Sequence, residues 1–233
     1  QGNFVQAMKA YHKCILLKPT HVDAYINMGV SLHLQGKIDN AIQAYKMSLS
    51  LNPKSPVIYN NIGNALKEQG KLDDAIKAYH KSISLNSENA EAYCNIGLTL
   101  HDQDKFDKAI EAFNKCILLE PNYAQAYNNK GNTLKKLSKF NEAIDLYKKA
   151  ISIRPDYAIA YNNWGSTLKD QGNLNEAIEL YNKAILFKAD YAEAYQNIGN
   201  AFKDQGDLDK AIDAYKKSIS LKPDCAIAYN NLG

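Results

Sequence analysis

The sequence lacks the patterns that mark common enzymes, membrane proteins and strongly charged chains. It contains no G-x-x-x-x-G-K-[ST], G-x-S-x-G or H-E-x-x-H segment. No apolar run approaches the roughly 20 residues that a membrane-spanning helix needs. Net charge is only +3, and lysines are interspersed with acidic residues, so electrostatics favours neither nucleic acid nor a membrane surface. We expect no catalysis, no cofactor, no small-molecule substrate, and no nucleic-acid or membrane partner.

Cysteine and histidine are also scarce and scattered. The four cysteines, Cys14, Cys94, Cys116 and Cys225, form no C-x-x-C pair, which argues against a redox or metal cluster. Such unpaired thiols are typical of a reducing compartment, so we expect a cytoplasmic or alternatively a nuclear protein.

One short pattern, Asn-x-Gly, recurs at a fixed spacing along the whole chain. Successive glycines of this pattern are 34 residues apart, at Gly29, Gly63, Gly97, Gly131, Gly165, Gly199 and Gly233. A period of this length indicates a solenoid, in which each repeat buries its apolar face only against its neighbours. His33 and His101 share one position two repeats apart, roughly 20 Å by helix spacing, too far to share a zinc ion. Cys14 and Cys116 fall at a position where other repeats carry Ser or Ala, so we expect packed thiols there.

Each repeat reads as two short amphipathic helices. Apolar residues recur at helical spacing from Tyr25 through Met28 to Leu32, and again from Ile38 through Ile42. A glycine between the two segments predicts a left-handed turn; it stands at Gly36, Gly70, Gly172 and Gly206, with Asp104 and Ser138 replacing it in two repeats. An acidic or amide residue three positions later is predicted to cap the second helix; these are Asp39, Asp73, Asp107, Asn141, Asn175 and Asp209.

These positions resemble the tetratricopeptide repeat. Its aromatic, Leu, Gly, Ala and aromatic positions are matched by Tyr59, Ile62, Gly63, Leu66, Ala75 and Tyr79, and again by Tyr161, Trp164, Gly165, Leu168, Ala177 and Tyr181. The resemblance covers the whole chain and implies an all-α fold, a right-handed superhelical solenoid of helix-turn-helix repeats. The implied repeats are 22–55, 56–89, 90–123, 124–157, 158–191 and 192–225. Residues 1–21 would supply the second helix of a partial repeat and 226–233 the start of another, so we expect a longer array.

A row of asparagines is the candidate binding site. In this family the first helices line a concave groove, so polar residues opposite the apolar stripe are expected to face a ligand. The predicted peptide-binding residues are Asn27, Asn61, Asn95, Asn129, Asn163, Asn197 and Asn231, with Asn64, Asn132 and Asn200 beside them. A side-chain amide offers a donor and an acceptor, which match an extended peptide backbone of any sequence. The alternative is that these amides form hydrogen bonds between helices.

Neighbouring rows vary and are expected to set specificity. Four apolar residues are expected around the first groove segment: Ile26, Val30, Leu34 and Val57. Cys94 with Leu98 is expected to form a similar apolar segment two repeats later. A basic row is largely offset by acidic residues and is read as a solvated helix face; its members are His33, Lys67, His101, Lys135, Lys169 and Lys203.

One charge stands in an otherwise apolar row. Lys130 occupies the place that Met28, Ile62, Ile96, Trp164 and Ile198 fill in other repeats. We expect Lys130 to bury its stem and extend its ammonium group to water.

We therefore predict a scaffold that binds a protein or peptide along an Asn-lined groove. The rows through Ile26 and Asn27 contain no Lys or Arg, unlike family members that hold a C-terminal carboxylate. The regular Asn ladder is similar to the substrate-binding superhelix of O-linked N-acetylglucosamine transferases. An alternative function is thus the substrate-recognition region of such a transferase, with its catalytic domain outside this chain.

Overall fold

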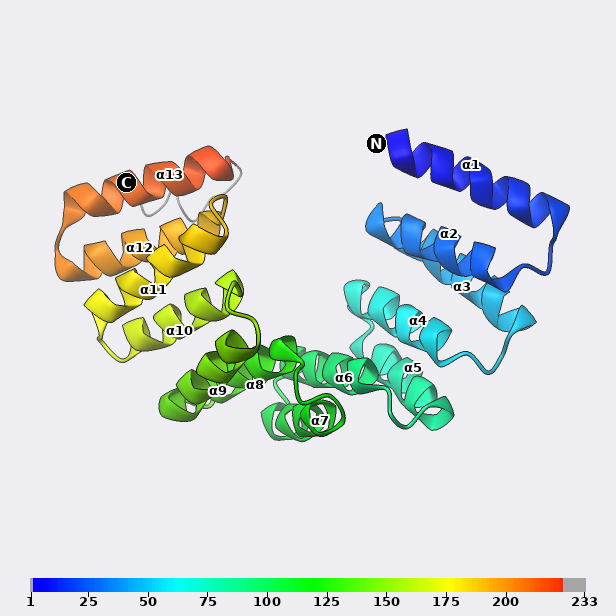
Figure 1. Cartoon of the computed structure of the whole chain (residues 1–233), viewed down its shortest axis with the longest axis horizontal. Helices are drawn as coiled ribbons and strands as arrows, with labels where there is room; N and C mark the ends of the chain where they lie inside the picture. Colours follow the sequence, from blue (N-terminus) through cyan, green and yellow to red (C-terminus); the bar gives the residue numbers. More distant parts are fainter. Residues whose placement is uncertain (1, 224–233) are drawn as a thin grey trace. The chain divides into compact units, whose positions relative to one another are not determined.

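The structure is a computed structural model that describes residues 2–223, with side chains described from residue 4. Thirteen helices and no strand occur within this range (Figure 1). The expected all-α solenoid of helix pairs is therefore confirmed. The predicted groove residue Asn231, Cys225 and the expected repeat start at 226–233 lie outside the described residues.

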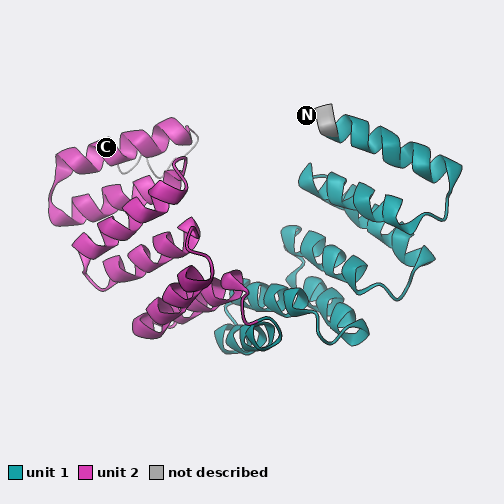
Figure 2. Ribbon diagram, viewed as in Figure 1, with its two compact units in different colours: residues 1–120 teal, residues 121–233 magenta. Residues whose placement is uncertain are grey.

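The chain divides into two compact units, residues 1–120 and residues 121–233 (Figure 2). Unit 1 contains α1 (Gly2–Leu17), α2 (Val22–Leu34), α3 (Ile38–Leu51), α4 (Pro56–Glu68), α5 (Leu72–Leu85), α6 (Ala90–Asp102) and α7 (Phe106–Leu119). Unit 2 contains α8 (Ala124–Lys136), α9 (Phe140–Ile153), α10 (Ala158–Asp170), α11 (Leu174–Phe187), α12 (Ala192–Gln205) and α13 (Leu208–Leu221).

Within each unit, successive helices form hairpins that pack on the next hairpin. The tightly packed pairs are α2 with α3, α4 with α5, α6 with α7, α8 with α9, α10 with α11 and α12 with α13. The first helix of a pair begins at residue 22, 56, 90, 124, 158 or 192, so the helices repeat with the spacing of the sequence pattern. Each hairpin thus presents the same helix faces to its neighbour.

The turn inside each hairpin is left-handed, as the sequence predicted. Gly70 has φ 74°, and the non-glycine replacements Asp104 and Ser138 have φ 57° and 58°. After Gly70, the Lys71 N–H donates to the Leu66 carbonyl at 3.0 Å, which satisfies a carbonyl that the end of α4 would otherwise leave free. Asp104 and Ser138 therefore hold a conformation that costs an L-residue more than glycine.

The predicted caps of the second helices are wrong. Helix α3 begins at Ile38 with Lys37 as its N-cap, so Asp39 lies inside the first turn. There it complements the positive end of the helix dipole and accepts a hydrogen bond from Gln69 Nε2 of the next repeat at 2.6 Å. The bond recurs with 30-residue separation in Gln103–Asp73, Gln171–Asn141 and Gln205–Asn175. The carboxylate or amide therefore links repeats at these four positions, and none of the six predicted residues is an N-cap.

The core of each hairpin is a ring packed on a glycine. A Cβ added to Gly63 would lie 2.4 Å from the Tyr79 ring, so only glycine lets α4 approach α5 this closely. In the complete repeats, the position at which Cys116 stands and other repeats carry Ser or Ala is fully buried, and Cys116 is 0% exposed, as predicted. Cys14 at the same position of the first repeat is half-buried.

Candidate functional site

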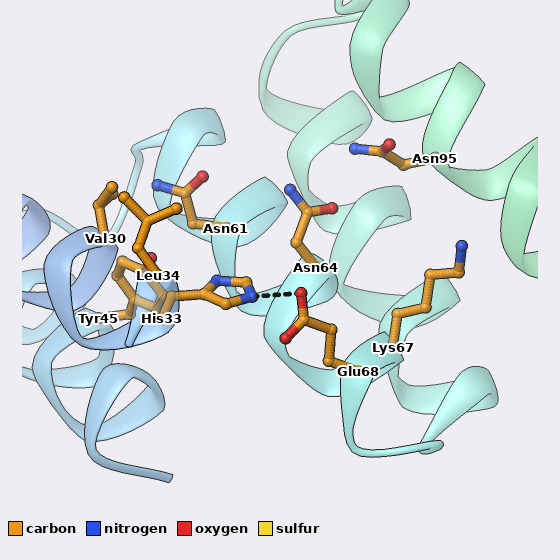
Figure 3. A pocket seen from close by; sticks show the side chains of 9 residues that line it. All are labelled: Val30, His33, Leu34, Tyr45, Asn61, Asn64, Lys67, Glu68 and Asn95. Atoms are coloured by element: carbon orange, nitrogen blue, oxygen red, sulfur yellow. Dashed lines mark ion pairs between the residues drawn. The ribbon is translucent and has the colours of Figure 1, made fainter. Parts of the chain in front are cut away.

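Unit 1 contains a hollow of about 720 Å³ on the face formed by its first helices. It is lined by Val30, His33, Leu34, Tyr45, Asn61, Asn64, Lys67, Glu68 and Asn95 (Figure 3). Three of the predicted groove residues, Asn61, Asn64 and Asn95, are thus brought together in one cavity.

Helical periodicity places these side chains on a common face. The opposite stripe of α2 is buried, with Leu32 8% exposed, whereas Val30 is 37% and Leu34 71% exposed. Because α2, α4 and α6 begin 34 residues apart, equivalent positions line up along the hollow. Val30, Leu34 and Tyr45 gather at one end in Figure 3, Asn95 and Lys67 lie at the other, and Asn64 lies between them.

Three amides of the Asn row form hydrogen bonds between helices, the alternative that the sequence left open. Asn95 Nδ2 donates to Asn60 Oδ1 at 3.2 Å, and Asn163 Nδ2 donates to Asn128 Oδ1 at 2.9 Å. Asn197 Nδ2 donates in the same way to the buried Asn162 at 3.0 Å. Each bond crosses to the preceding repeat and leaves the Oδ1 of the donor amide available.

The residues that accept these bonds are buried, contrary to the expectation that their row lines the groove. The row through Ile26 was expected to line the groove, but Asn60, Asn128 and Asn162 are 3%, 2% and 1% exposed. Cys94 in the same row is 3% exposed, so it does not form a groove patch with Leu98. Asn60, Asn128 and Asn162 face the next first helix of their own unit, a contact that periodicity within one helix does not reveal.

The buried Cys94 thiol lies against Cys116 of the paired helix. A hydrogen bond with Cys94 and burial together raise the pKa of the Cys116 thiol well above its usual range. Cys116 is therefore a neutral, packed thiol at physiological pH. The described cysteines Cys14, Cys94 and Cys116 are all free of disulfides.

The remaining members of the row are less constrained. Asn27 is exposed, and Asn61 is half-buried and makes no side-chain hydrogen bond within the described residues. Asn129 accepts from its neighbour Asn128 at 3.2 Å. Asn61 therefore presents both ends of its amide to the hollow.

The second predicted row is held by tyrosines, a contact that the sequence analysis missed. Asn64, Asn132 and Asn200 accept hydrogen bonds from the hydroxyls of Tyr79, Tyr147 and Tyr215 at 2.8, 2.8 and 2.9 Å. The sequence signal for this contact is that an asparagine of the first helix and a tyrosine of the second helix recur 15 residues apart. Where Leu98 replaces the asparagine, Phe113 replaces the tyrosine.

The basic row pairs with acids of the following repeat. His33 Nε2 lies 2.9 Å from Glu68 Oε1, and Lys67 Nζ lies 3.0 Å from Asp102 Oδ2. Unit 2 repeats the arrangement in Lys135–Asp170 at 3.0 Å and Lys169–Asp204 at 3.3 Å. The lysine pairs offset the charges of Lys67, Lys135 and Lys169, as the acidic neighbours of the row suggested, and leave no basic stripe at these positions.

Lys130 lies half-buried on α8 in the row that is otherwise apolar. Desolvation by burial lowers the pKa of its ammonium group below the ordinary value, an effect that Glu142 partly opposes. The partial exposure agrees with a buried stem and a charged end that reaches water.

No group of three His, Cys, Asp or Glu residues in the described range is close enough together to hold a metal ion. Among the same residues, no helix is both long and apolar enough to cross a bilayer.

Comparisons with known proteins identify the repeat. Family profiles described as TPR repeat match residues 31–70 and 63–104, and profiles described as tetratricopeptide repeat match 90–123, 124–157 and 156–224. Comparison with curated protein sequences gave no match.

Several solved structures share the fold of this chain. The MamA protein is 32% identical, with a TM-score of 0.59 and coverage of 74% of this chain and 94% of MamA. A chain of the APC/C hetero-tetramer Cut9-Hcn1 is 18% identical with a TM-score of 0.84; the match covers 99% of this chain but 46% of that one. YrrB, a TPR protein with an unusual peptide-binding site, is 23% identical with a TM-score of 0.57, and 81% of this chain and 97% of YrrB are covered.

Proposed function

Because the chain belongs to the tetratricopeptide repeat family, we propose that it is a protein-interaction scaffold whose asparagine row binds an extended peptide. The ligand is a protein segment or peptide, and these residues perform no catalysis. The peptide-binding site reported for YrrB belongs to that protein; for this chain, the ligand class rests on the amides of the groove.

One observation carries the proposal: Asn61, Asn64 and Asn95 line one hollow of about 720 Å³. A peptide backbone offers alternating N–H and C=O groups, and a carboxamide can pair with either one. The inter-helix bond of Asn95 uses one of its N–H groups. That bond fixes the amide orientation and leaves its oxygen and a second N–H for a ligand.

The spacing of the helices suits an extended ligand. Packed helices lie about 10 Å apart, and an extended chain advances about 3.3 Å per residue. One asparagine can therefore contact about every third ligand residue. The rows that vary between repeats would then recognise the ligand side chains.

A transferase substrate-recognition region, the alternative from the sequence, would use the same groove. The two functions differ in what the full-length gene encodes besides this array. A glycosyltransferase domain in that gene would favour the alternative, and its absence would favour the scaffold.

The test is binding of peptides selected from a random library of extended sequences. Asn61→Ala should weaken binding about fivefold, since a hydrogen bond to the ligand contributes about 1 kcal/mol, while the thermal midpoint holds or rises. The matched control is Asn114→Ala, which removes an exposed asparagine from α7 and should leave affinity unchanged. Equal affinities of both variants and the parent chain would reject the asparagine row as the site.

A further inference from the structure

Two tyrosines of the second helices, Tyr45 and Tyr181, lack the asparagine acceptor that their equivalents have. Tyr79, Tyr147 and Tyr215 each donate to an asparagine 15 residues earlier. In the first complete repeat that position is Val30, which cannot accept. Within the described residues the Tyr45 hydroxyl makes no hydrogen bond, although Tyr45 is only 1% exposed.

This hydroxyl is open to the groove. Tyr45 lines the hollow beside Val30 and Leu34 (Figure 3). Tyr181, where Ser166 stands at the asparagine position, also has an unpartnered hydroxyl, but its oxygen is sealed from solvent. A ligand can therefore reach the hydroxyl of Tyr45 and not that of Tyr181.

The surroundings of Tyr45 define what would pair with it. Burial and the nearby Glu68 raise the pKa of Tyr45 to about 12, so at neutral pH it is a protonated donor. The negative charge of Glu68, held by His33 at 2.9 Å, disfavours an anionic ligand group here. A neutral carbonyl oxygen is the acceptor that suits this position.

The side chains beside Tyr45 are apolar at two positions where most other repeats have a polar residue. Val30 stands at the position of Asn64, and Leu34 at the position of Glu68. Both are accessible, at 37% and 71% exposure. An apolar surface beside a buried, unsatisfied donor suits one residue of a peptide. The side chain of that residue would pack on the apolar surface, and its backbone carbonyl would accept a hydrogen bond from the donor.

We propose that Val30, Leu34 and Tyr45 form a subsite that binds one aliphatic residue of an extended peptide, whose backbone carbonyl accepts a hydrogen bond from the Tyr45 hydroxyl. The subsite rests on the proposed function, because it specifies which ligand residue the groove selects. It fixes the register of a peptide that the asparagines alone would hold at any register.

The experiment selects twelve-residue peptides from a random displayed library on the chain and measures their affinities by fluorescence anisotropy. Selected peptides should share one aliphatic position. Tyr45→Phe and Val30→Asn should each weaken their binding about tenfold, the first by removing the donor and the second by supplying an internal acceptor. The matched control Tyr181→Phe removes a hydroxyl that no ligand can reach and should leave affinity unchanged.

The outcomes separate the subsite from the groove. Peptides that bind the parent chain and all three variants equally would overturn the subsite and leave the groove proposal intact. Selection that yields no binding peptide would reject the groove and the subsite together. A thermal midpoint that falls in Tyr45→Phe but not in Tyr181→Phe would show an internal hydrogen bond of Tyr45, and would also overturn the subsite.

Discussion

Asn61 and Asn163 occupy the same place in their repeats, but their side chains have different surroundings. Asn163 donates to the buried oxygen of Asn128 at 2.9 Å, whereas Asn61 faces the hollow. The difference follows from the preceding repeat, where Ile26 stands at the position of Asn60 and Asn128. An asparagine at the same repeat position thus stabilises the fold in one repeat and remains available to bind a ligand in another.

The first prediction uses this pair. Asn163→Ala should lower the free energy of unfolding by about 1 to 3 kcal/mol, because the buried Asn128 oxygen loses its donor. Asn61→Ala should keep stability or raise it by up to about 0.5 kcal/mol through better helix propensity. Urea denaturation of both variants measures the difference, and equal losses would mean that Asn61 also bonds within the fold.

The second prediction concerns Lys130. Burial disfavours its charged form, as the lowered pKa shows, and the equivalent residues are apolar. Lys130→Leu should raise the free energy of unfolding by on the order of 1 kcal/mol and leave peptide affinity unchanged. The control Lys136→Leu changes an exposed lysine of the same helix and should give no such gain. A loss of affinity in Lys130→Leu would place Lys130 in the groove.

At the scale of the element, each hairpin depends on one left-handed residue and one close helix contact. Ser138 adopts φ 58° between α8 and α9, and the equivalent Gly172 adopts φ 84° between α10 and α11. The turn geometry is therefore retained even where the sequence does not favour it. Packing of the two helices, rather than the turn residue, determines the turn.

The third prediction follows from this strain. Ser138→Gly should raise the free energy of unfolding by about 1 kcal/mol, because glycine adopts positive φ at little steric cost. Ser152→Gly, at an exposed position within α9, should instead lower it by up to about 1 kcal/mol. Thermal melts of the two variants should shift in opposite directions, and parallel shifts would contradict the strain argument.

At the scale of the whole molecule, stability is a sum of hairpins and of contacts between neighbours. The same inter-repeat bonds recur within each unit, among them Gln69–Asp39 in unit 1 and Gln171–Asn141 in unit 2. Helix α1 packs mainly against α2, so it has fewer neighbours than a helix inside the array. Local unfolding of α1 should therefore require less free energy than local unfolding of a helix inside the array.

The fourth prediction is the resulting exchange pattern. Amide hydrogens of α1 should exchange faster than those of α4, α5, α10 and α11, whose hairpins have a neighbour on both sides within their own unit. Hydrogen exchange followed by mass spectrometry resolves these segments. Equal protection of α1 and α5 would show that the chain opens only as a whole.

The fifth prediction concerns alkaline pH. Burial raises the pKa of the Tyr45 hydroxyl to about 12 and raises those of Tyr79, Tyr147 and Tyr181 as well. In the unfolded chain these groups titrate near pH 10, so at higher pH the folded state binds more protons. Stability should therefore hold below about pH 10 and fall as pH rises towards 12. Denaturation across this range tests the fall, which should be smaller in Tyr45→Phe.

Much of the fold could be predicted from the sequence, because the information is local. Helical spacing in Tyr25, Met28 and Leu32 identifies the buried stripe, and the residues around Gly36 identify the turn. The start of the second helices was placed wrongly at Asp39, because an aspartate suits both an N-cap and a first turn. Sequence alone does not distinguish these two positions.

The site was less predictable, because it depends on how repeats contact one another. Asn60 is buried against the next first helix, where Asn95 donates to it, and no pattern within one helix encodes that contact. The hydrogen bond from Tyr79 to Asn64 likewise joins two helices. Its only trace in the sequence is the joint replacement by Leu98 and Phe113.

That joint replacement has a consequence for how the groove can diverge. A repeat with the Asn–Tyr pair needs two substitutions to reach the Leu–Phe pair seen at Leu98 and Phe113. Either substitution alone leaves one polar group without its hydrogen-bond partner, which costs about 1 to 3 kcal/mol of stability if that group is sealed from water. Val30 with Tyr45 is one such intermediate. Gene conversion or unequal crossing over between repeats transfers donor and acceptor in one event, since both lie within 34 residues. Recombination of whole repeats can therefore change the groove residues without the destabilised intermediate that single mutations pass through.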